Sequence, residues 1–379
     1  MSAIYLDYNA TTPVDPRVIA AMLPYLGREF GNPSSGHETG LRARMAVAEA
    51  RAQVEALMGA QPDTVIFTGG GSESNNLALK GAALARRAAG HGDHVITTAV
   101  EHPAVTEPCR WLAMQGFRVT TVPVDADGRV DPDDVGRTLT DGTILVSIMH
   151  ANNEVGTIQP VRAVADLAHA RGAWVHTDAA QSVGKVPVRV DDLGVDLLSV
   201  AGHKLYAPKG VGALYVRAGV VLEPQIHGAG HERGLRAGTE NVPGVVGLGM
   251  ACAIVAEELA EEMPRLRELR DRLEAALTRR PGDLRVNGHP EQRLPNTSSL
   301  SFAGVDAAAL VHDLRMVAAS AGAACHAEDG EVSGVLAAMG VPAEWARGTL
   351  RLSVGRPTSE RDVDRAADGI AAAVEERRQ

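Results

Sequence analysis

The sequence predicts an α/β fold, in which a large domain with a mostly parallel mixed sheet flanked by helices is joined to a smaller α+β domain. Through the middle of the chain, short runs of β-branched residues alternate with longer Ala-rich stretches, which is typical of parallel strands joined by helical crossovers. After Asn241 the composition changes, and a stretch rich in Ala, Glu, Leu and Arg reaches Arg280. This stretch predicts one long helix that leads into the second domain. A chain of 379 residues is long enough for both domains.

Short apolar runs predict the strands of the large domain, and helices are expected to fill most of the gaps between them. The expected strands are 64–68, 94–98, 118–123, 143–149, 174–177, 197–200 and 212–216. For the smaller domain we expect strands at 298–302 and 349–354 and helices from Asp306 and Ser359. We assign 14–257 to the large domain, and 1–13 with 258–379 to the smaller one.

Composition and charge favour a cytoplasmic enzyme that acts on a small molecule. Hydrophobic residues make up 45% of the chain and charged residues 22%, as in ordinary soluble proteins. The net charge is -10 and no segment combines clustered Lys and Arg with aromatic residues, so we expect no direct contact with nucleic acid. The N-terminus lacks a basic segment followed by an apolar one, and no eighteen apolar residues run uninterrupted. We therefore expect no targeting to a membrane.

Three cysteines, Cys109, Cys252 and Cys325, lie far apart and form no CxxC pair. Neither a disulfide framework nor a metal site is indicated. Cys325 lies in a stretch of small and polar residues, 321–330, which predicts a loop. A thiol there indicates sulfur chemistry. The alternative, an inert small hydrophobic residue, is the better interpretation for Cys109 and Cys252.

Asp178 and Lys204 are 26 residues apart, and each follows an apolar, strand-like segment. Pyridoxal phosphate (PLP) needs a lysine amine to hold its aldehyde as a Schiff base, and a carboxylate to keep its pyridine nitrogen protonated. Most lysines stay exposed to solvent, whereas Lys204 lies between His203 and Leu205 after an apolar strand. The pair therefore predicts PLP as the cofactor.

The glycine-rich segment 67–76 follows a predicted strand and opens a predicted helix. Backbone N–H groups and the positive end of the helix would face an anion there, so Gly71 and Ser72 are candidates to bind a phosphate. A glycine-rich turn capped by Ser72 or Ser74 explains the same residues. The motif alone does not decide between these two interpretations.

Three more polar side chains follow predicted strands, where α/β folds collect ligand-binding groups. His102 could stack on the cofactor ring and handle protons. Asn153 could bind a substrate carboxylate, and Gln181 could donate to the phenolic oxygen of the cofactor. The alternatives are a partly buried loop histidine, an Asx-turn at Asn152, and an ordinary amide at a helix start.

Together these motifs resemble the cysteine desulfurases, which are class V, fold-type I PLP enzymes. The resemblance covers nearly the whole chain in the expected order. The residues that carry it are 5–13 (YLDYNATTP), 31–35 (GNPSS), 71–76 (GSESNN), 152–156 (NNEVG), 202–204 (GHK) and 231–239 (HERGLRAGT). The resemblance implies a fold-type I transferase that converts L-cysteine to L-alanine.

The resemblance also implies roles for the site residues. Lys204 holds the cofactor and removes the substrate α-proton, Asp178 pairs with the pyridinium, His102 stacks on the ring and Gln181 contacts the phenolate oxygen. Asn153, which also borders the cofactor, binds the cysteine carboxylate with Arg351, because a guanidinium can form two parallel hydrogen bonds. For Arg351 the alternative is a surface salt bridge. The phosphate is assigned to Gly71, Ser72 and His203, and to Thr239 from the partner subunit of a homodimer.

Cys325 matches the nucleophile of the family, which accepts sulfur as a persulfide and passes it to an acceptor protein. Its loop resembles the longer form found in one group of relatives. The chain departs from the family at three points. Ala201 lacks a hydroxyl that would bind phosphate, His326 and Ala327 replace small hydroxyl residues, and no apolar tail precedes Gln379. We therefore expect an acceptor other than the usual iron–sulfur scaffold.

Two other classes of function remain open. A selenocysteine lyase or another C–S lyase of the same fold would release its product without a persulfide on Cys325. A non-catalytic sulfur-transfer subunit would keep the fold without the chemistry. The pathway supplied is open too, whether iron–sulfur assembly, thiolated tRNA, a sulfur-containing metabolite or DNA modification.

Overall fold

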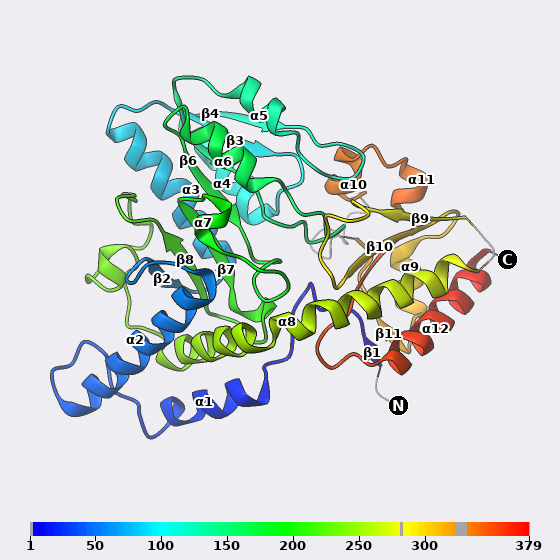
Figure 1. Cartoon of the computed structure of the whole chain (residues 1–379), viewed down its shortest axis with the longest axis horizontal. Coiled ribbons are helices and arrows are strands. Elements are labelled where there is room, and N and C mark those ends of the chain that lie inside the picture. The colour runs from blue at the N-terminus through cyan, green and yellow to red at the C-terminus, as the bar shows by residue number, and fades with distance from the viewer. Residues whose placement is uncertain (1–2, 281–282, 323–331, 379) are drawn as a thin grey trace.

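The larger part of the molecule is built around a seven-stranded mixed sheet (Figure 1). The computed structural model describes residues 3–280, 283–322 and 332–378. The strand order is β2-β8-β7-β6-β5-β3-β4, and only β8 runs antiparallel to its neighbours. All seven predicted strands are confirmed, with ends that differ by at most two residues. They are β2 (Val65–Thr68), β3 (His94–Thr98), β4 (Arg118–Val122), β5 (Thr143–Ser147), β6 (Trp174–Asp178), β7 (Leu197–Ala201) and β8 (Gly212–Val216).

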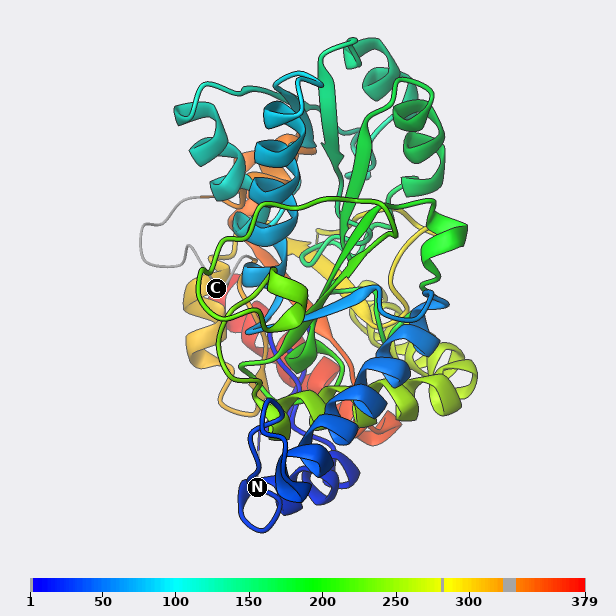
Figure 2. The ribbon, with the colours of Figure 1, turned by 90° about the vertical axis from the view of Figure 1, so that its left-hand side faces the viewer.

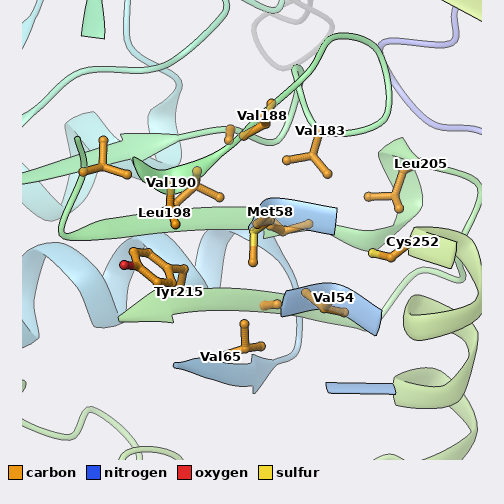
Figure 3. Packing of buried hydrophobic residues seen from close by; sticks show 14 of the residues in the cluster. Val54, Met58, Val65, Val183, Val188, Val190, Leu198, Leu205, Tyr215 and Cys252 are labelled. Atoms are coloured by element: carbon orange, nitrogen blue, oxygen red, sulfur yellow. The ribbon is translucent and has the colours of Figure 1, made fainter. Parts of the chain in front are cut away.

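Helices cover both faces of this sheet (Figure 2). Successive strand residues point to opposite faces: Val65 and Phe67 pack with α2, α6 and α8 (Val242–Thr278), whereas Ile66 packs with α3 and α4. Figure 3 shows the first of these layers, in which Val54 and Met58 lie near strand residues. Burial on both faces explains why the strands read as continuous apolar runs. The helices are α2 (Glu38–Met58), α3 (Gly71–Ala88), α4 (Pro103–Met114), α5 (Pro132–Thr138), α6 (Val161–His169) and α7 (Val190–Leu193).

The predicted long helix is α8 (Val242–Thr278), and it connects the two parts of the molecule (Figure 1). The side chain of Asn241 caps its start by accepting a hydrogen bond of 3.2 Å from the Gly244 N–H. Its first half packs on α1 (Pro16–Leu26) and α2. By length and composition α8 could cross a membrane, but 56% of its most apolar stretch is buried inside the protein.

The smaller part combines an antiparallel sheet with helices. Its strands β9 (Leu284–Asn287), β10 (Thr297–Phe302) and β12 (Thr349–Ser353) pair in the order β12-β10-β9, and β1 (Ile4–Tyr5) pairs with β11 (Val317–Ala318). The predicted strands at 298–302 and 349–354 and the predicted helices from Asp306 and Ser359 are confirmed. The helices are α9 (Ala307–Asp313), α10 (Gly334–Ala338), α11 (Ala343–Ala346) and α12 (Glu360–Arg378).

Two regions of buried apolar side chains lie at opposite ends of α8. Residues 245–255 of α8 belong to the core of the large sheet, whereas Leu266 to Leu277 belong to a second core with Ile4, Leu6 and α12. The domain division that we predict at 257/258 falls between these stretches and stays a prediction.

Candidate active site

A pocket of about 500 Å³ lies where the carboxyl ends of the parallel strands meet. In open α/β sheets, ligands bind outside this edge. The loops after β3, β5, β6 and β7 contribute polar side chains to its wall, and β12 adds an arginine. The pocket thus brings together five of the predicted site residues: His102, Asn153, Gln181, Lys204 and Arg351.

Lys204 lies in a short 3₁₀ turn after β7. Its Nζ donates hydrogen bonds to the backbone carbonyls of Asn9, at 2.5 Å, and Ala10, at 2.8 Å. Gly202 makes the turn possible, because a Cβ there would lie 2.9 Å from the Val211 carbonyl oxygen. The turn and the N-terminal segment together hold the amine at the pocket.

Asp178 is the last residue of β6 and its side chain is buried. Its Oδ2 accepts a hydrogen bond of 2.6 Å from the Asn75 amide, and its Oδ1 accepts one of 2.9 Å from the Ala180 N–H. Asn75 comes from α3, so this helix orients the carboxylate. Strands β6 and β7 are parallel neighbours. Asp178, at the end of β6, and Lys204, just after β7, therefore lie at the same edge of the sheet.

His102 caps α4: its Nδ1 accepts a hydrogen bond of 3.0 Å from the Ala104 N–H. The neutral ring must therefore carry its proton on Nε2. The alternative for His102 was a partly buried loop histidine that bonds to the backbone. The structure shows such a bond, but His102 also lines the pocket.

Glu101, the residue before His102, was not predicted from the sequence to belong to the site. Its Oε1 accepts hydrogen bonds from Thr98 Oγ1 and the Met149 N–H, at 2.7 and 2.9 Å. Its buried Oε2 has no partner among the described residues. Burial raises the pKa of Glu101 to about 8, and the charge of Asp178 acts in the same direction. An acidic residue at a predicted strand end was the available signal.

The start of α3 is open to an anion. Gly70, with a φ of +148°, precedes the helix, and no side chain from the described ranges of the sequence accepts a capping hydrogen bond there. A Cβ on Gly71 would lie 3.2 Å from the Cβ of Ala201, so the strand end borders the loop closely. Ser72 is exposed in the first turn. These observations favour the phosphate interpretation over a capped turn, since the free N–H groups and the helix dipole attract anions.

His203 adjoins Lys204, and its Nδ1 lies 3.2 Å from Thr11 Oγ1. Burial, together with the positive charges of Lys204, Lys209 and Lys185, lowers the pKa of His203 to about 4. Without an anion the imidazole is therefore neutral at physiological pH.

Arg351 is buried in β12, which contradicts the surface salt-bridge alternative. Its Nη2 pairs with Asp7 Oδ1 at 2.7 Å, and its Nη1 donates to the Asn153 carbonyl at 3.1 Å. Its buried Nε has no partner in the part of the chain that the structure describes. Arg351 thus holds the backbone of Asn153 at the pocket.

Two predicted residues are not placed at the pocket. Thr239 is exposed and does not line the pocket of its own chain. Cys325 lies outside the described residues. On one side of the undescribed stretch, Ser320 bonds to the backbone of Arg351, and on the other Gly334 and Val335 line the pocket.

Cys109 and Cys252 are both buried. Burial raises the pKa of each thiol to about 12, and the charge of Glu101 contributes at Cys109. The thiolate is the reactive form, so the burial of both thiols supports their interpretation as inert small hydrophobic residues, which stays a prediction.

Two further residues at the site were not predicted from the sequence: Asn9, which lines the pocket, and Lys185, which lies behind its wall. Asn9 O accepts from both Lys204 and Gln181, and Lys185 Nζ donates to Gln181 Oε1. For Lys185, the available signal was a lysine inside the apolar run Ser182 to Val186.

Comparison with known proteins identifies the family. The family model described as aminotransferase class-V matches residues 4–366. A cysteine desulfurase IscS of Dictyoglomus turgidum is 47% identical over 377 residues, which cover 99% of this chain and 95% of that protein. A solved structure of a NifS-like protein has a TM-score of 0.92 and 38% identity, and covers 99% of this chain and 100% of its own.

A second solved structure, SspA in complex with cysteine, has a TM-score of 0.82 and 37% identity, and covers 92% of this chain and 98% of its own. The predicted fold-type I architecture is therefore confirmed by both sequence and structure. The chain belongs to the class-V aminotransferases, as a member of their cysteine desulfurase family.

Proposed function

We propose that this cysteine desulfurase binds PLP and L-cysteine in the pocket around Lys204 and transfers the substrate sulfur to Cys325 as a persulfide. The observation that carries the proposal is the pocket itself. It combines a lysine from one strand end, a histidine from another and a buried arginine from the smaller sheet, next to the buried carboxylate of Asp178.

The described residues fit PLP by their chemistry. Lys204 offers the amine, Asp178 a buried carboxylate for the pyridine nitrogen, and His102 a ring beside them. The uncapped start of α3 suits the phosphate, at Gly71 and Ser72 with His203 nearby. Gln181 Nε2 is a donor for the phenolic oxygen, and Asn153 closes the wall. When bound, PLP supplies an electron sink that makes the α-proton of the substrate removable.

Arg351 and Asn153 are the residues that we assign to the substrate carboxylate. The Arg351 guanidinium is buried and already pairs with Asp7, so it is held rigidly before substrate arrives. Charge-assisted hydrogen bonds to a carboxylate are stronger than neutral ones. The solved relative SspA is in complex with cysteine, which supports cysteine as the substrate.

Proton transfer is assigned to Lys204 and His102. The Lys204 amine takes the proton from Cα of the substrate. The Ala104 N–H fixes the His102 ring through Nδ1, and His102 lines the pocket, so this ring can hold or give a proton at one defined atom, Nε2.

Sulfur transfer is assigned to Cys325. Its thiolate forms an S–S bond with Sγ of the substrate while the Cβ–Sγ bond breaks. The bonding electron pair stays on Cβ, which takes a proton and becomes a methyl group, and Lys204 returns the proton to Cα, so that the product is L-alanine. Beyond Cys325, Gly334 and Val335 line the pocket, and before it Ser320 bonds to the backbone of Arg351, a pocket residue. The two other cysteines are buried. A sulfur-acceptor protein would then remove the persulfide sulfur.

A homodimer is proposed from the outer surface of α1 and α2. Large apolar side chains are exposed on these helices and the segment between them. They are Ile19, Leu23, Leu26, Phe30, Leu41 and Met45. Such a concentration is typical of an interface. Thr239 is exposed, as expected for a residue that completes the partner's phosphate site.

The direct test uses the purified protein with PLP and L-cysteine. The wild type should show a visible absorption band and release alanine from cysteine. Lys204→Ala should lose both, whereas Lys80→Met, which removes a lysine that stacks on Trp111, should keep both. A Lys204→Ala variant that still turns over cysteine would refute the assignment of the pocket.

A further inference from the structure

Lys185 is a second lysine at the site, hidden behind the pocket wall. The chain has only four lysines: Lys80, Lys185, Lys204 and Lys209. Lys185 is 5% exposed, although lysine is almost never buried without partners. Its Nζ donates to Gln181 Oε1 at 2.7 Å and to Asn9 Oδ1 at 2.9 Å.

These two bonds determine how two amides are turned. Each amide has one oxygen and one NH₂ group, and Lys185 takes both oxygens. The NH₂ of Gln181 is therefore directed away, and donates to the Asn9 carbonyl at 3.0 Å. The NH₂ of Asn9 donates to Thr297 Oγ1 at 2.8 Å and to the Asn153 carbonyl at 3.3 Å. Without Lys185, Gln181 could turn by half a revolution and present its oxygen to the pocket.

Asn9 connects this arrangement to the reacting lysine. Its carbonyl accepts the hydrogen bond from Lys204 Nζ as well as the one from Gln181. Its Oδ1 also accepts from Asn296, at 3.1 Å, in the smaller part of the molecule. Lys185 thus supports three residues that line the pocket, Asn9, Gln181 and Lys204, from one point behind them.

The arrangement does not require a charged amine. Burial holds the pKa of Lys185 well below its ordinary range, and the positive charges of Lys204 and Arg351 act in the same direction. A neutral amine has two N–H groups, and Lys185 has two amide oxygens to satisfy. Both protonation states therefore keep the two amides in the same orientation.

We propose that Lys185 is a positioning residue of the desulfurase reaction, which fixes Gln181 as a hydrogen-bond donor toward the bound cofactor and holds Asn9 against Lys204. This inference rests on the proposed function of the pocket. It assigns Lys185 no contact with substrate or cofactor, and its action depends on Gln181 and Asn9.

The test is a double-mutant cycle with Lys185→Met and Gln181→Ala, read by the wavelength of the cofactor absorption band and by the dissociation constant of PLP. Methionine has a similar length but cannot donate to either amide. Because it leaves the buried Gln181 Oε1 without its donor and removes one of the two hydrogen bonds to Asn9 Oδ1, Lys185→Met should shift the band and weaken PLP at least ~10-fold. Introduced into Gln181→Ala, the same substitution should shift the band much less. Lys80→Met is the matched control and should change neither quantity.

A Lys185→Met protein with the wild-type band and PLP affinity would overturn the inference, and so would a band shift of equal size with and without Gln181. If Lys185→Met does not fold, as judged by circular dichroism, Lys185→Gln replaces it in the same cycle. This variant keeps an amide donor on a shorter side chain, so a smaller shift is expected, and no shift overturns the inference. Failure of the wild type itself to bind PLP would instead refute the proposed function.

Discussion

Glu101 is a buried carboxyl group beside the site, and its ionisation opposes folding. Its pKa rises from the ordinary 4.5 to about 8, mainly because of burial. Between these two values the unfolded chain releases the proton while the folded chain keeps it. The contribution of Glu101 to stability is therefore complete below pH 4.5 and is lost as the pH rises to about 8.

We predict that Glu101→Gln flattens this pH dependence, because glutamine has the shape of the protonated acid and does not ionise. The free energy of unfolding of the variant relative to the wild type should increase between pH 5 and pH 8, by up to about 1.4 kcal/mol per pH unit. Urea unfolding at several pH values measures it. Glu268→Gln is the control at an exposed position. Its free energy of unfolding should change with pH as that of the wild type does. A constant difference between Glu101→Gln and the wild type would contradict the account.

At the scale of elements, α4 serves both the fold and the site, because His102 is its N-cap and also lines the pocket. Asparagine caps helices well but has no imidazole ring. Alanine has no ring and is also a poor cap. We predict that His102→Ala loses about 1 kcal/mol of stability and that His102→Asn stays close to the wild type. Both should lose roughly 100-fold in activity. Denaturant unfolding of the apoprotein and steady-state kinetics separate the two roles.

If His102→Asn were less stable than His102→Ala, the Nδ1 hydrogen bond would not stabilise the helix as a cap. Full activity of His102→Asn would remove the ring from the reaction.

The strands of the large sheet could be predicted because burial on both faces makes them continuous apolar runs. Elements with a weaker pattern could not. Strand β9 is partly exposed and alternates polar with apolar residues. Helix α2 packs small residues such as Gly40, Ala43 and Ala50 against its neighbours, so it lacks the stripe of large apolar side chains that marks a helix.

The same distinction holds for the site. His102, Asn153, Gln181 and Lys204 could be predicted because parallel strands end at one edge of the sheet. Asn9 and Lys185 could not, because their roles depend on contacts between segments far apart in the chain. Asn9 bonds to Thr297 and Lys185 bonds to Asn9 across 288 and 176 positions. No local pattern encodes such distances.

At the scale of the whole molecule, the exposed apolar surface of α1 and α2 predicts a dimer. Leu26 and Phe30 are 65% and 77% exposed. Light scattering should give twice the chain mass of 39.7 kDa. The double variant Leu26→Glu with Phe30→Glu should be a monomer and should lose activity, because Thr239 of the partner no longer completes the phosphate site.

Met114→Glu is the matched control, since Met114 is 75% exposed on α4. It should remain dimeric and active. A wild-type protein that scatters as a monomer, or a monomeric double variant with full activity, would contradict the shared site.

We propose that one pocket, built where the large sheet meets the smaller part of the molecule, moves sulfur from L-cysteine to Cys325. The most direct measurement is mass spectrometry of the protein with bound PLP after one equivalent of L-cysteine without reductant, with alanine quantified in the same sample. The account predicts one added sulfur atom on the peptide that contains Cys325, matched by one alanine, and neither from Cys325→Ser. Stoichiometric alanine from Cys325→Ser, or an added sulfur on Cys109 or Cys252, would contradict it.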